Sequence, residues 1–181
     1  MLGGARSGKS SYAEELASSL SKKVCYLATA RITDKEMEKR VALHQRRRPQ
    51  SWKTIELSQK EIEKGEIGRV AGCDVLLLDC ITNLLYRLLE KYGLDRMEVV
   101  ANSLEESIEK EISVFIKGFI KYISHAKEDI IIVSNEVGLG LVPPYPLGRV
   151  FRDLLGFLNK EIAGAADEVY LFVAGLKQRL K

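Results

Sequence analysis

The sequence predicts a single α/β domain, residues 1–181, in which helices flank a mostly parallel β-sheet. Short apolar runs of strand length alternate with longer stretches of helical periodicity, which is the pattern of βαβ units. These runs are apolar throughout, as expected of strands covered on both faces. The composition, 46% hydrophobic and 29% charged, is that of a globular protein whose core needs neither disulfides nor a structural metal.

Five runs are candidate strands, and three amphipathic stretches are candidate helices. Strands are expected at Val24 to Ala28, Val75 to Asp79, Ile130 to Ser134 and Val169 to Ala174, with a weaker candidate at Trp52 to Glu56. Helical faces are expected between Tyr12 and Leu20, in a long helix from Glu98 to Ser124, and between Leu147 and Ile162. The polar segment from Lys60 to Gly72 predicts a surface connection, and prolines mark a loop around Pro143 to Pro146.

The net charge, the cysteines and the apolar runs indicate which partners and which compartment to expect. The 28 Lys+Arg against 25 Asp+Glu leave a net charge of +3, too small to attract nucleic acid without a clustered patch. The 3 cysteines lack CxxC spacing and suit buried thiols of a reduced compartment. No run approaches the ~18 apolar residues of a membrane span, and no export signal is recognisable. We therefore expect a cytoplasmic protein that has no membrane span and no nucleic acid partner.

The N-terminus carries a complete P-loop motif, G-x-x-x-x-G-K-[ST]. Its glycines let successive backbone N–H groups turn toward phosphate oxygens at the start of a helix. Lys9 is expected to reach the β- and γ-phosphates, and Ser10 to bind Mg²⁺. Because only Met1 and Leu2 precede the motif, the strand that should come before it is almost missing, and we expect that the start is shortened. The fold class is thus that of P-loop NTPases, RecA-like in type, with the motif formed by Gly3, Gly4, Ala5, Arg6, Ser7, Gly8, Lys9 and Ser10.

An acidic residue ends one of the apolar runs. Asp79 closes the strand candidate that begins at Val75, which is where P-loop proteins place an acid near magnesium. An aspartate at a strand end can instead cap the following helix. With a P-loop upstream, we favour the magnesium role.

A histidine beside an arginine run is the candidate nucleophile. Met37, Val41 and His44 share one helical face, and arginines follow at positions 46, 47 and 48. A neutral imidazole can attack phosphorus while guanidinium groups neutralise a triphosphate. The alternatives are a packing role for His44 and a solvated basic face for the arginines.

The strand candidate that ends at Ser134 is followed by Asn135 and Glu136. Such residues point into the crevice above the carboxyl edge of a parallel sheet. They either orient water or substrate near the γ-phosphate or form an ordinary turn, and the sequence favours neither. Asn159-Lys160 lacks the aspartate that guanine-specific switch GTPases place after N-K-x, which argues against a Ras-like module.

Together these segments resemble the bifunctional adenosylcobinamide kinase/adenosylcobinamide-phosphate guanylyltransferases of cobalamin biosynthesis. The resemblance runs in order along nearly the whole chain, and its Asn-Glu-Val-Gly and His-x-x-x-Arg-Pro segments are more specific than the P-loop. Besides the P-loop it is carried by Tyr26-Leu27-Ala28-Thr29-Ala30, His44 with Arg48-Pro49, Leu78-Asp79-Cys80-Ile81-Thr82-Asn83, and Ser134-Asn135-Glu136-Val137-Gly138.

The resemblance implies two reactions at one site. ATP or GTP phosphorylates the aminopropanol hydroxyl of adenosylcobinamide. GTP then guanylylates a histidine with release of pyrophosphate, and the GMP passes to the cobinamide phosphate, giving adenosylcobinamide-GDP. His44 matches the family's nucleophile, whereas His125 has no basic neighbours. Members of the family form homo-oligomers, trimers among them, for which Leu84, Leu85, Leu88 and Leu89 are candidate surface residues or, equally, core.

The resemblance also implies the rest of the nucleotide site. Mg²⁺ is expected at Ser10 and Asp79. Glu56 is expected to accept hydrogen bonds from the N1–H and 2-amino edge of guanine. Beyond the P-loop, the nucleotide-binding residues are expected to be Thr29, Ala30, Arg31, Gln45, Arg46, Arg47, Arg48, Glu56 and Asp79.

Two other functions fit the residues without the resemblance. A different P-loop small-molecule kinase keeps the phosphate loop, Lys9 and Asp79 and makes His44 a packing residue, with no enzyme-bound nucleotide. A GTP-dependent switch protein binds nucleotide and changes partners, and the missing N-K-x-D motif counts against it.

Overall fold

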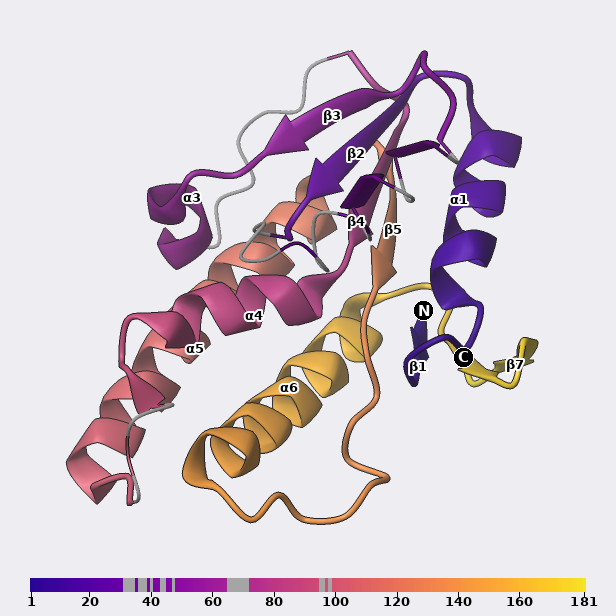
Figure 1. Ribbon diagram of the computed structural model, residues 1–181. Helices are drawn as coiled ribbons and strands as arrows, with labels where there is room; N and C mark the ends of the chain where they lie inside the picture. Colours follow the sequence, from indigo (N-terminus) through magenta and orange to yellow (C-terminus); the bar gives the residue numbers. More distant parts are fainter. Residues whose placement is uncertain are drawn as a thin grey trace.

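The computed structural model describes residues 1–30, 35, 39, 41–42, 45–46, 48–64, 72–94, 97 and 99–181. Strands and helices alternate along this part of the chain (Figure 1). The strands are β1 (Leu2–Gly3), β2 (Val24–Ala28), β3 (Lys53–Glu56), β4 (Val75–Asp79), β5 (Asp129–Val133), β6 (Tyr170–Val173) and β7 (Leu176–Arg179). The helices are α1 (Lys9–Leu20), α3 (Gln59–Lys64), α4 (Ile81–Glu90), α5 (Asn102–His125) and α6 (Pro146–Ala165).

The strands form two groups that backbone hydrogen bonds join into one surface. One group has the order β3-β2-β4-β5 and is parallel; in the other, β1 is parallel to β6, and β7 is antiparallel at the edge. Between them, the Met1 amine donates to Ile132 O at 2.7 Å, and Ser134 N–H donates to Met1 O at 2.9 Å. The order across the sheet is therefore β3-β2-β4-β5-β1-β6-β7, with β1 in the interior.

Alternate side chains of the central strands enter two different apolar clusters. Leu27, Leu76 and Leu78 pack with residues of α4, α5 and α6, whereas Val75 and Leu77 pack with Ala13 and Ala17 of α1 and with their strand neighbours. Figure 1 shows α1 on one side of the sheet and α4, α5 and α6 on the other. This three-layer arrangement explains why the strands are apolar on both faces.

Most of the expected elements are confirmed, with small shifts at their ends. β2 and β4 have the expected bounds, β5 begins and ends one residue earlier, and β6 is shorter at both ends. The expectation of a surface connection from Lys60 was wrong for its first part, because α3 extends to Lys64; residues 65–71 lie outside the described residues. The long helix starts at Asn102, and Glu98 also lies outside them.

The structure also shows where the leucines of α4 lie and how the strand before the P-loop is paired. The leucines of α4, for which surface and core positions were both expected, are core residues: Leu84, Leu85, Leu88 and Leu89 are each at most 1% exposed. The strand before the P-loop, which is almost missing from the sequence, is present as two residues that pair with Leu171 and Phe172 of β6. Within the described residues, no helix is long and apolar enough to cross a membrane.

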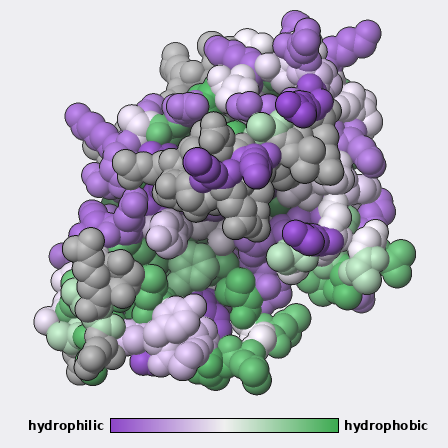
Figure 2. Space-filling model, viewed as in Figure 1, coloured by the Kyte–Doolittle hydropathy of each residue, from purple (hydrophilic) through white to green (hydrophobic). Residues whose placement is uncertain are grey.

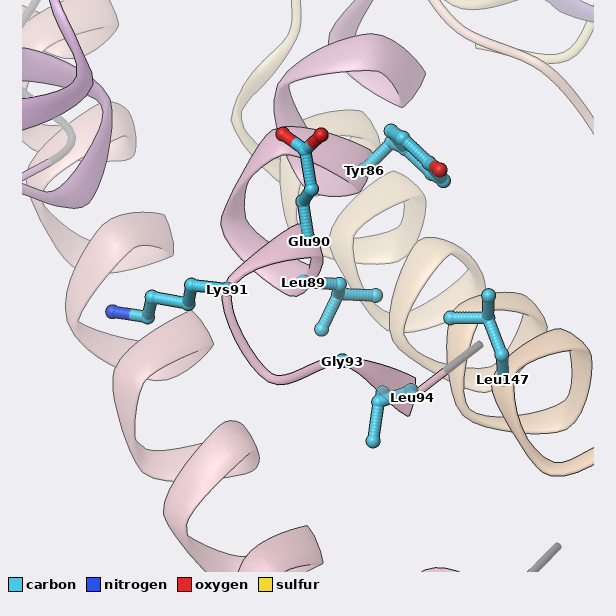
Figure 3. A pocket seen from close by; sticks show the side chains of 7 residues that line it. All are labelled: Tyr86, Leu89, Glu90, Lys91, Gly93, Leu94 and Leu147. Atoms are coloured by element: carbon cyan, nitrogen blue, oxygen red, sulfur yellow. The ribbon is translucent and has the colours of Figure 1, made fainter. Parts of the chain in front are cut away.

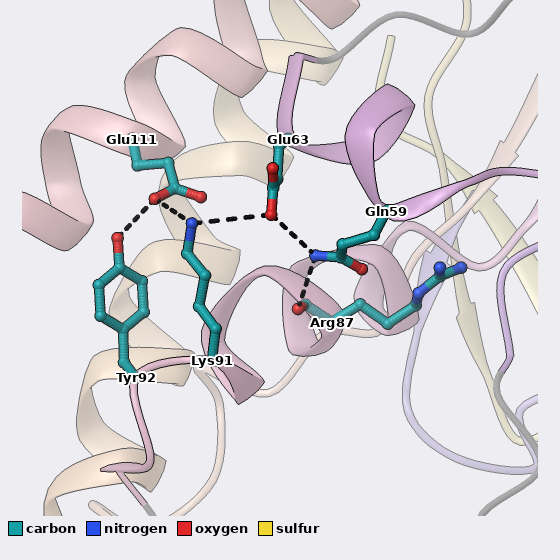
Figure 4. A network of polar contacts seen from close by, with 6 residues as sticks. All are labelled: Gln59, Glu63, Arg87, Lys91, Tyr92 and Glu111. Atoms are coloured by element: carbon teal, nitrogen blue, oxygen red, sulfur yellow. Dashed lines mark hydrogen bonds and ion pairs between the residues drawn. The ribbon is translucent and has the colours of Figure 1, made fainter.

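A polar junction connects α3, the end of α4 and α5 (Figure 4). Lys91 Nζ lies 2.7 Å from Glu111 of α5 and 3.9 Å from Glu63 of α3. Tyr92 donates its hydroxyl proton to Glu111 at 2.5 Å, and burial together with this bond raises the pKa of Tyr92 to about 12. Because partly exposed ion pairs contribute at most about 1 kcal/mol, the junction orients these helices more than it stabilises them.

Candidate nucleotide site

The P-loop (residues 3–10) joins β1 to α1 through backbone conformations that favour glycine. Gly8 caps α1 with φ 94°, and Arg6 also has a positive φ of 57°. The first N–H groups of α1 have no partner within the helix, so this turn directs donors and the positive end of the helix dipole to the same point. The arrangement fits an anion such as phosphate.

Gly3 is enclosed so closely that no other residue fits there. A Cβ at position 3 would lie 2.6 Å from Phe172 O and 2.7 Å from Ser7 Oγ. Within the part of the chain that the structure describes, the buried Ser7 Oγ has no hydrogen-bond partner. The motif therefore needs its first glycine for contact with β6 and leaves one buried hydroxyl inside the loop unsatisfied.

Lys9 folds back over the loop that precedes it. Its side chain is 7% exposed, and its Nζ donates to Gly4 O at 2.9 Å. Burial lowers the pKa of Lys9, while the nearby Cys80 and Asp79 act in the opposite direction. The ammonium group thus lies between the P-loop backbone and the end of β4. In the same motif Gly4, Ala5, Arg6 and Gly8 are exposed, and Ser10 is half-buried.

The carboxyl ends of three neighbouring strands bring two predicted acids to one edge. Ala28 of β2 is in register with Glu56 of β3 on one side and with Asp79 of β4 on the other. Glu56 is exposed, Asp79 is half-buried, and Ala30, just beyond β2, is also half-buried. Strand ends of this kind form the ligand-binding crevice of parallel sheets.

Thr29 and Tyr26 fix the end of β4. Thr29 is buried, and its Oγ1 accepts a hydrogen bond from Cys80 N–H at 2.9 Å. Tyr26 donates its hydroxyl proton to Asp79 O at 3.1 Å, and burial and the Asp79 charge raise the pKa of Tyr26. The expected nucleotide residue Thr29 therefore holds two strand ends together in this structure, which sets the position of the Asp79 carboxylate.

Ser10 and Asp79 fit the donor chemistry of Mg²⁺. Ser10 lies in the first turn of α1, directly after Lys9 in the sequence. The charge of the nearby Asp79 acts to raise the pKa of Lys9. A hydroxyl and a carboxylate are hard oxygen ligands, and Mg²⁺ is usually held by one or two such groups together with phosphates. The two residues come from neighbouring parts of the site, as this mode of binding requires.

The described arginines of the run differ in burial: the Arg48 side chain is buried, whereas Arg46 is exposed. The Arg48 guanidinium lies 3.5 Å from the centre of the Tyr26 ring, its side chain is 8% exposed, and its Nε is 4.0 Å from Glu14 of α1. Gln45 and Arg46 are exposed. Arg31, His44 and Arg47, like Met37 of the same expected helical face, lie outside the described residues.

A buried polar network shapes the turn after β5. Asn159 of α6 accepts from Ser134 Oγ at 2.6 Å and donates to Asn135 O at 3.0 Å, and Asn135 N–H donates to Thr82 Oγ1 at 3.0 Å. Glu136 accepts from Gly138 N–H at 2.5 Å, as in an ordinary turn, and its own N–H donates to Gly3 O at 3.1 Å. Asn135 and Glu136 thus connect the P-loop to α4 and α6.

Thr82 and Asn159 also belong to this region, although the sequence did not predict a role for them there. Both are buried polar residues at helix positions, and each pairs with a group distant in the sequence. The one available signal was polarity: Asn159 interrupts the apolar face of α6 beside Leu158. A buried side chain of that kind requires a hydrogen-bond partner.

A separate pocket lies between the far end of α4 and the start of α6 (Figure 3). Its volume is about 330 Å³, and it is lined by Tyr86, Leu89, Glu90, Lys91, Gly93, Leu94 and Leu147. No P-loop or strand-end residue lines it. Since α4 begins beside the end of β4 and rises about 1.5 Å per residue, the pocket is more than one helical turn from the nucleotide site.

The fold and the P-loop define the chain as a P-loop nucleotide-binding α/β protein. Comparison with known proteins defines it further: the family model described as "Cobinamide kinase / cobinamide phosphate guanyltransferase" matches residues 1–180, and the chain belongs to this family.

Three curated relatives are similar over nearly their whole length. The bifunctional adenosylcobalamin biosynthesis protein CobU of Escherichia coli (strain K12) is 38% identical over 99% of this chain and 97% of the relative. The protein of the same name from Salmonella typhimurium is 37% identical over the same shares of both chains. The bifunctional adenosylcobalamin biosynthesis protein CobP of Pseudomonas aeruginosa is 38% identical over 100% of this chain and 95% of the relative.

Replacing Arg48 tests whether this arginine is a structural anchor. We expect Arg48→Ala to lower the free energy of unfolding by about 2 kcal/mol, because a desolvated cation loses its aromatic partner. Arg46→Ala, at an exposed position, should change it by less than about 0.5 kcal/mol. Urea unfolding measures both. An Arg48→Ala protein of unchanged stability would show that Arg48 does not anchor β2 to α1.

Proposed function

We propose that the chain carries out both reactions of its family, kinase and guanylyltransferase, at one nucleotide site built on the P-loop. The observation that carries this proposal is the P-loop itself: backbone donors, the helix terminus and the buried Lys9 ammonium converge where a triphosphate would lie. The neighbouring strand ends add Asp79 and Glu56 along one edge. One site suffices for both reactions because each begins with a bound nucleoside triphosphate.

In the kinase reaction, the P-loop holds the triphosphate of ATP or GTP. The aminopropanol hydroxyl of adenosylcobinamide attacks the γ-phosphorus, the bond to the β-phosphate oxygen breaks, and the nucleoside diphosphate leaves. Lys9 offsets charge on the β- and γ-phosphates, and the backbone N–H groups position them. Ser10 and Asp79 would hold Mg²⁺, which supplies charge neutralisation on the phosphate oxygens.

In the guanylyltransferase reaction, His44 is the nucleophile. A neutral imidazole nitrogen, available near pH 7 because its ordinary pKa is about 6.5, attacks the α-phosphorus of GTP and releases pyrophosphate. A phosphate oxygen of adenosylcobinamide phosphate then attacks the same phosphorus, and the P–N bond breaks to give adenosylcobinamide-GDP. The covalent intermediate divides one difficult displacement into two easier ones.

The remaining residues of the proposed site bind the nucleotide around these reacting groups. Arg31, Gln45, Arg46 and Arg47 would lie along the triphosphate, with Arg48 beside them on the Tyr26 ring. Thr29 and Ala30 would complete this part of the site at the end of β2. Glu56 would accept the N1–H and 2-amino protons of guanine, and its exposed position at the end of β3 supports this role.

We further propose that the enzyme works in the cytoplasm as a homo-oligomer, a trimer by family resemblance. Figure 2 shows apolar residues gathered on the lower part of the molecule, where Figure 1 places the loop between β5 and α6. The exposed apolar residues of this loop are Leu139, Leu141, Val142 and Tyr145. A subunit interface would cover such residues, and a solution mass of one chain, measured by light scattering, would contradict this part of the proposal.

The two reactions should separate when His44 is replaced. After incubation with Mg²⁺ and GTP labelled at the α-phosphate, the wild-type protein should retain acid-labile, alkali-stable label, and His44→Ala should retain none. The His44→Ala variant should keep its kinase activity, because γ-phosphate transfer needs no histidine nucleophile.

The matched control is His125→Ala, since His125 is exposed at the end of α5. This variant should label like the wild type, and Lys9→Ala should impair both reactions. Label that persists in His44→Ala would refute the assignment of the nucleophile. A wild-type protein that takes up no label yet phosphorylates a corrinoid would be a kinase alone.

The guanine role of Glu56 predicts a change in base preference. Inosine triphosphate lacks the 2-amino group of GTP. The substitution Glu56→Gln therefore removes one charged hydrogen bond only from the complex with GTP. We expect it to lower kcat/KM for GTP about tenfold more than for inosine triphosphate. Guanylylation rates with the two nucleotides measure this ratio. Glu106→Gln, on the exposed part of α5, is the control. An equal effect on both nucleotides would remove Glu56 from the base site.

A further inference from the structure

The turn between β6 and β7 lies directly against the P-loop. Ala174 and Gly175 form this two-residue turn with φ values of 51° and 81°, the conformation of tight hairpins. Gly175 N–H donates to Ser7 O at 3.1 Å. A Cβ on Gly8 would lie 3.5 Å from Gly175 Cα, so the two backbones approach closely. The contact joins segments more than 160 residues apart in the sequence.

The hairpin is held in place on its P-loop side by aromatic and polar contacts to α1. Lys177 of β7 donates to the Tyr12 hydroxyl at 2.5 Å, and its Nζ lies 4.3 Å from the centre of the Tyr12 ring. The Tyr12 ring is also 5.3 Å from the Phe172 ring of β6. Through these contacts the first turns of α1 and the hairpin keep a fixed relative position.

The end of the chain beyond β7 is attached to the carboxyl end of α6. Lys181 Nζ donates to Ala163 O at 3.2 Å, Gly164 O at 3.0 Å and Ala166 O at 2.6 Å. A cation at this point also interacts favourably with the helix dipole. The hairpin is therefore fixed at both ends and is able to act as a rigid support.

We propose that Gly175 is a positioning residue for the phosphate-binding backbone of the P-loop. In a planar trans peptide the C=O and N–H groups point in opposite directions. The Ser7 carbonyl belongs to the same peptide unit as the Gly8 N–H, so the bond from Gly175 to Ser7 O turns the Gly8 N–H away from the hairpin. Gly175 thereby fixes one donor of the loop before nucleotide binds. This inference rests on the proposed role of the P-loop as the nucleotide site.

Glycine is needed at position 175 for its conformation rather than for space. No described residue lies within 4 Å of a Cβ added there, but its φ of 81° is one that side-chain-bearing residues rarely adopt. Asparagine tolerates this region, whereas β-branched residues do not. Gly175→Asn should therefore keep the turn in place better than Gly175→Val. Gly72 offers a matched control, because it too has a positive φ, 92°, with no described residue within 4 Å of an added Cβ. It lies just before β4, at the amino ends of the parallel strands, whereas Gly175 lies at the carboxyl end of β6.

The test compares Gly175→Val, Gly175→Asn and Gly72→Val by thermal unfolding, by affinity for a non-hydrolysable GTP analogue with Mg²⁺, and by kcat and KM. We expect Gly175→Val to raise the nucleotide Kd and KM about tenfold in both reactions, with the KM for the corrinoid unchanged. Gly175→Asn should show a smaller rise. Gly72→Val should lose similar thermal stability and keep the wild-type nucleotide Kd.

The positioning role of Gly175 and the assignment of the nucleotide site are overturned by different results. Unchanged nucleotide Kd in Gly175→Val, while Lys9→Ala loses binding, would overturn the positioning role and leave the P-loop assignment intact. An equal rise in Gly72→Val would also overturn it, because the effect would then follow from general destabilisation. Unchanged binding in Lys9→Ala would refute the proposed nucleotide site itself. Should Gly175→Val fail to fold, Gly175→Asn against Gly72→Asn provides the same comparison.

Discussion

The structure depends on how the backbone of the P-loop is held. Between β1 and α1 this segment directs N–H groups outward, and no regular helix or sheet hydrogen bonds of its own keep it in that conformation. The carbonyls of Gly3, at the start of this loop, and of Ser7, shortly before α1, accept hydrogen bonds from Glu136 N–H and Gly175 N–H, respectively. Each bond fixes a peptide plane and so the direction of the following N–H group, that of Gly4 in one case and Gly8 in the other. Two distant segments of the chain therefore set the geometry of one short loop.

Helix α6 supports both of these segments. Its buried Asn159 holds the turn after β5 through Ser134 and the Asn135 carbonyl. Its carboxyl end accepts three hydrogen bonds from Lys181, which follows the hairpin. On the opposite face of the sheet, Arg48 lies on Tyr26, which in turn bonds to the end of β4. Polar contacts at the sheet's carboxyl edge thus fix the positions of the strand ends, while the apolar clusters hold the layers together.

The sequence predicted the parts of the fold that depend on continuous apolar runs. β2 and β4 have the expected bounds because four of their five residues are buried, and the P-loop motif identified the start of α1. β7 could not be predicted, because its four residues are all exposed and its pairing depends on the conformation of the preceding turn. The partners of Asn159 and Thr82 were equally out of reach, since a polar residue on a helix does not indicate which distant backbone group it will meet. The buried position of Arg48 was also unexpected, because an arginine run gives no sign of which member lies on an aromatic ring.

Both proposed reactions depend on one nucleotide site, built on the P-loop. The most direct measurement is a calorimetric titration, with Mg²⁺ present, of a non-hydrolysable ATP analogue into protein saturated with a non-hydrolysable GTP analogue. Because a single site cannot hold both analogues, we expect competition, with a total of one nucleotide bound per chain. Independent binding of both analogues, giving two nucleotides per chain, would contradict it and assign the two reactions to separate sites.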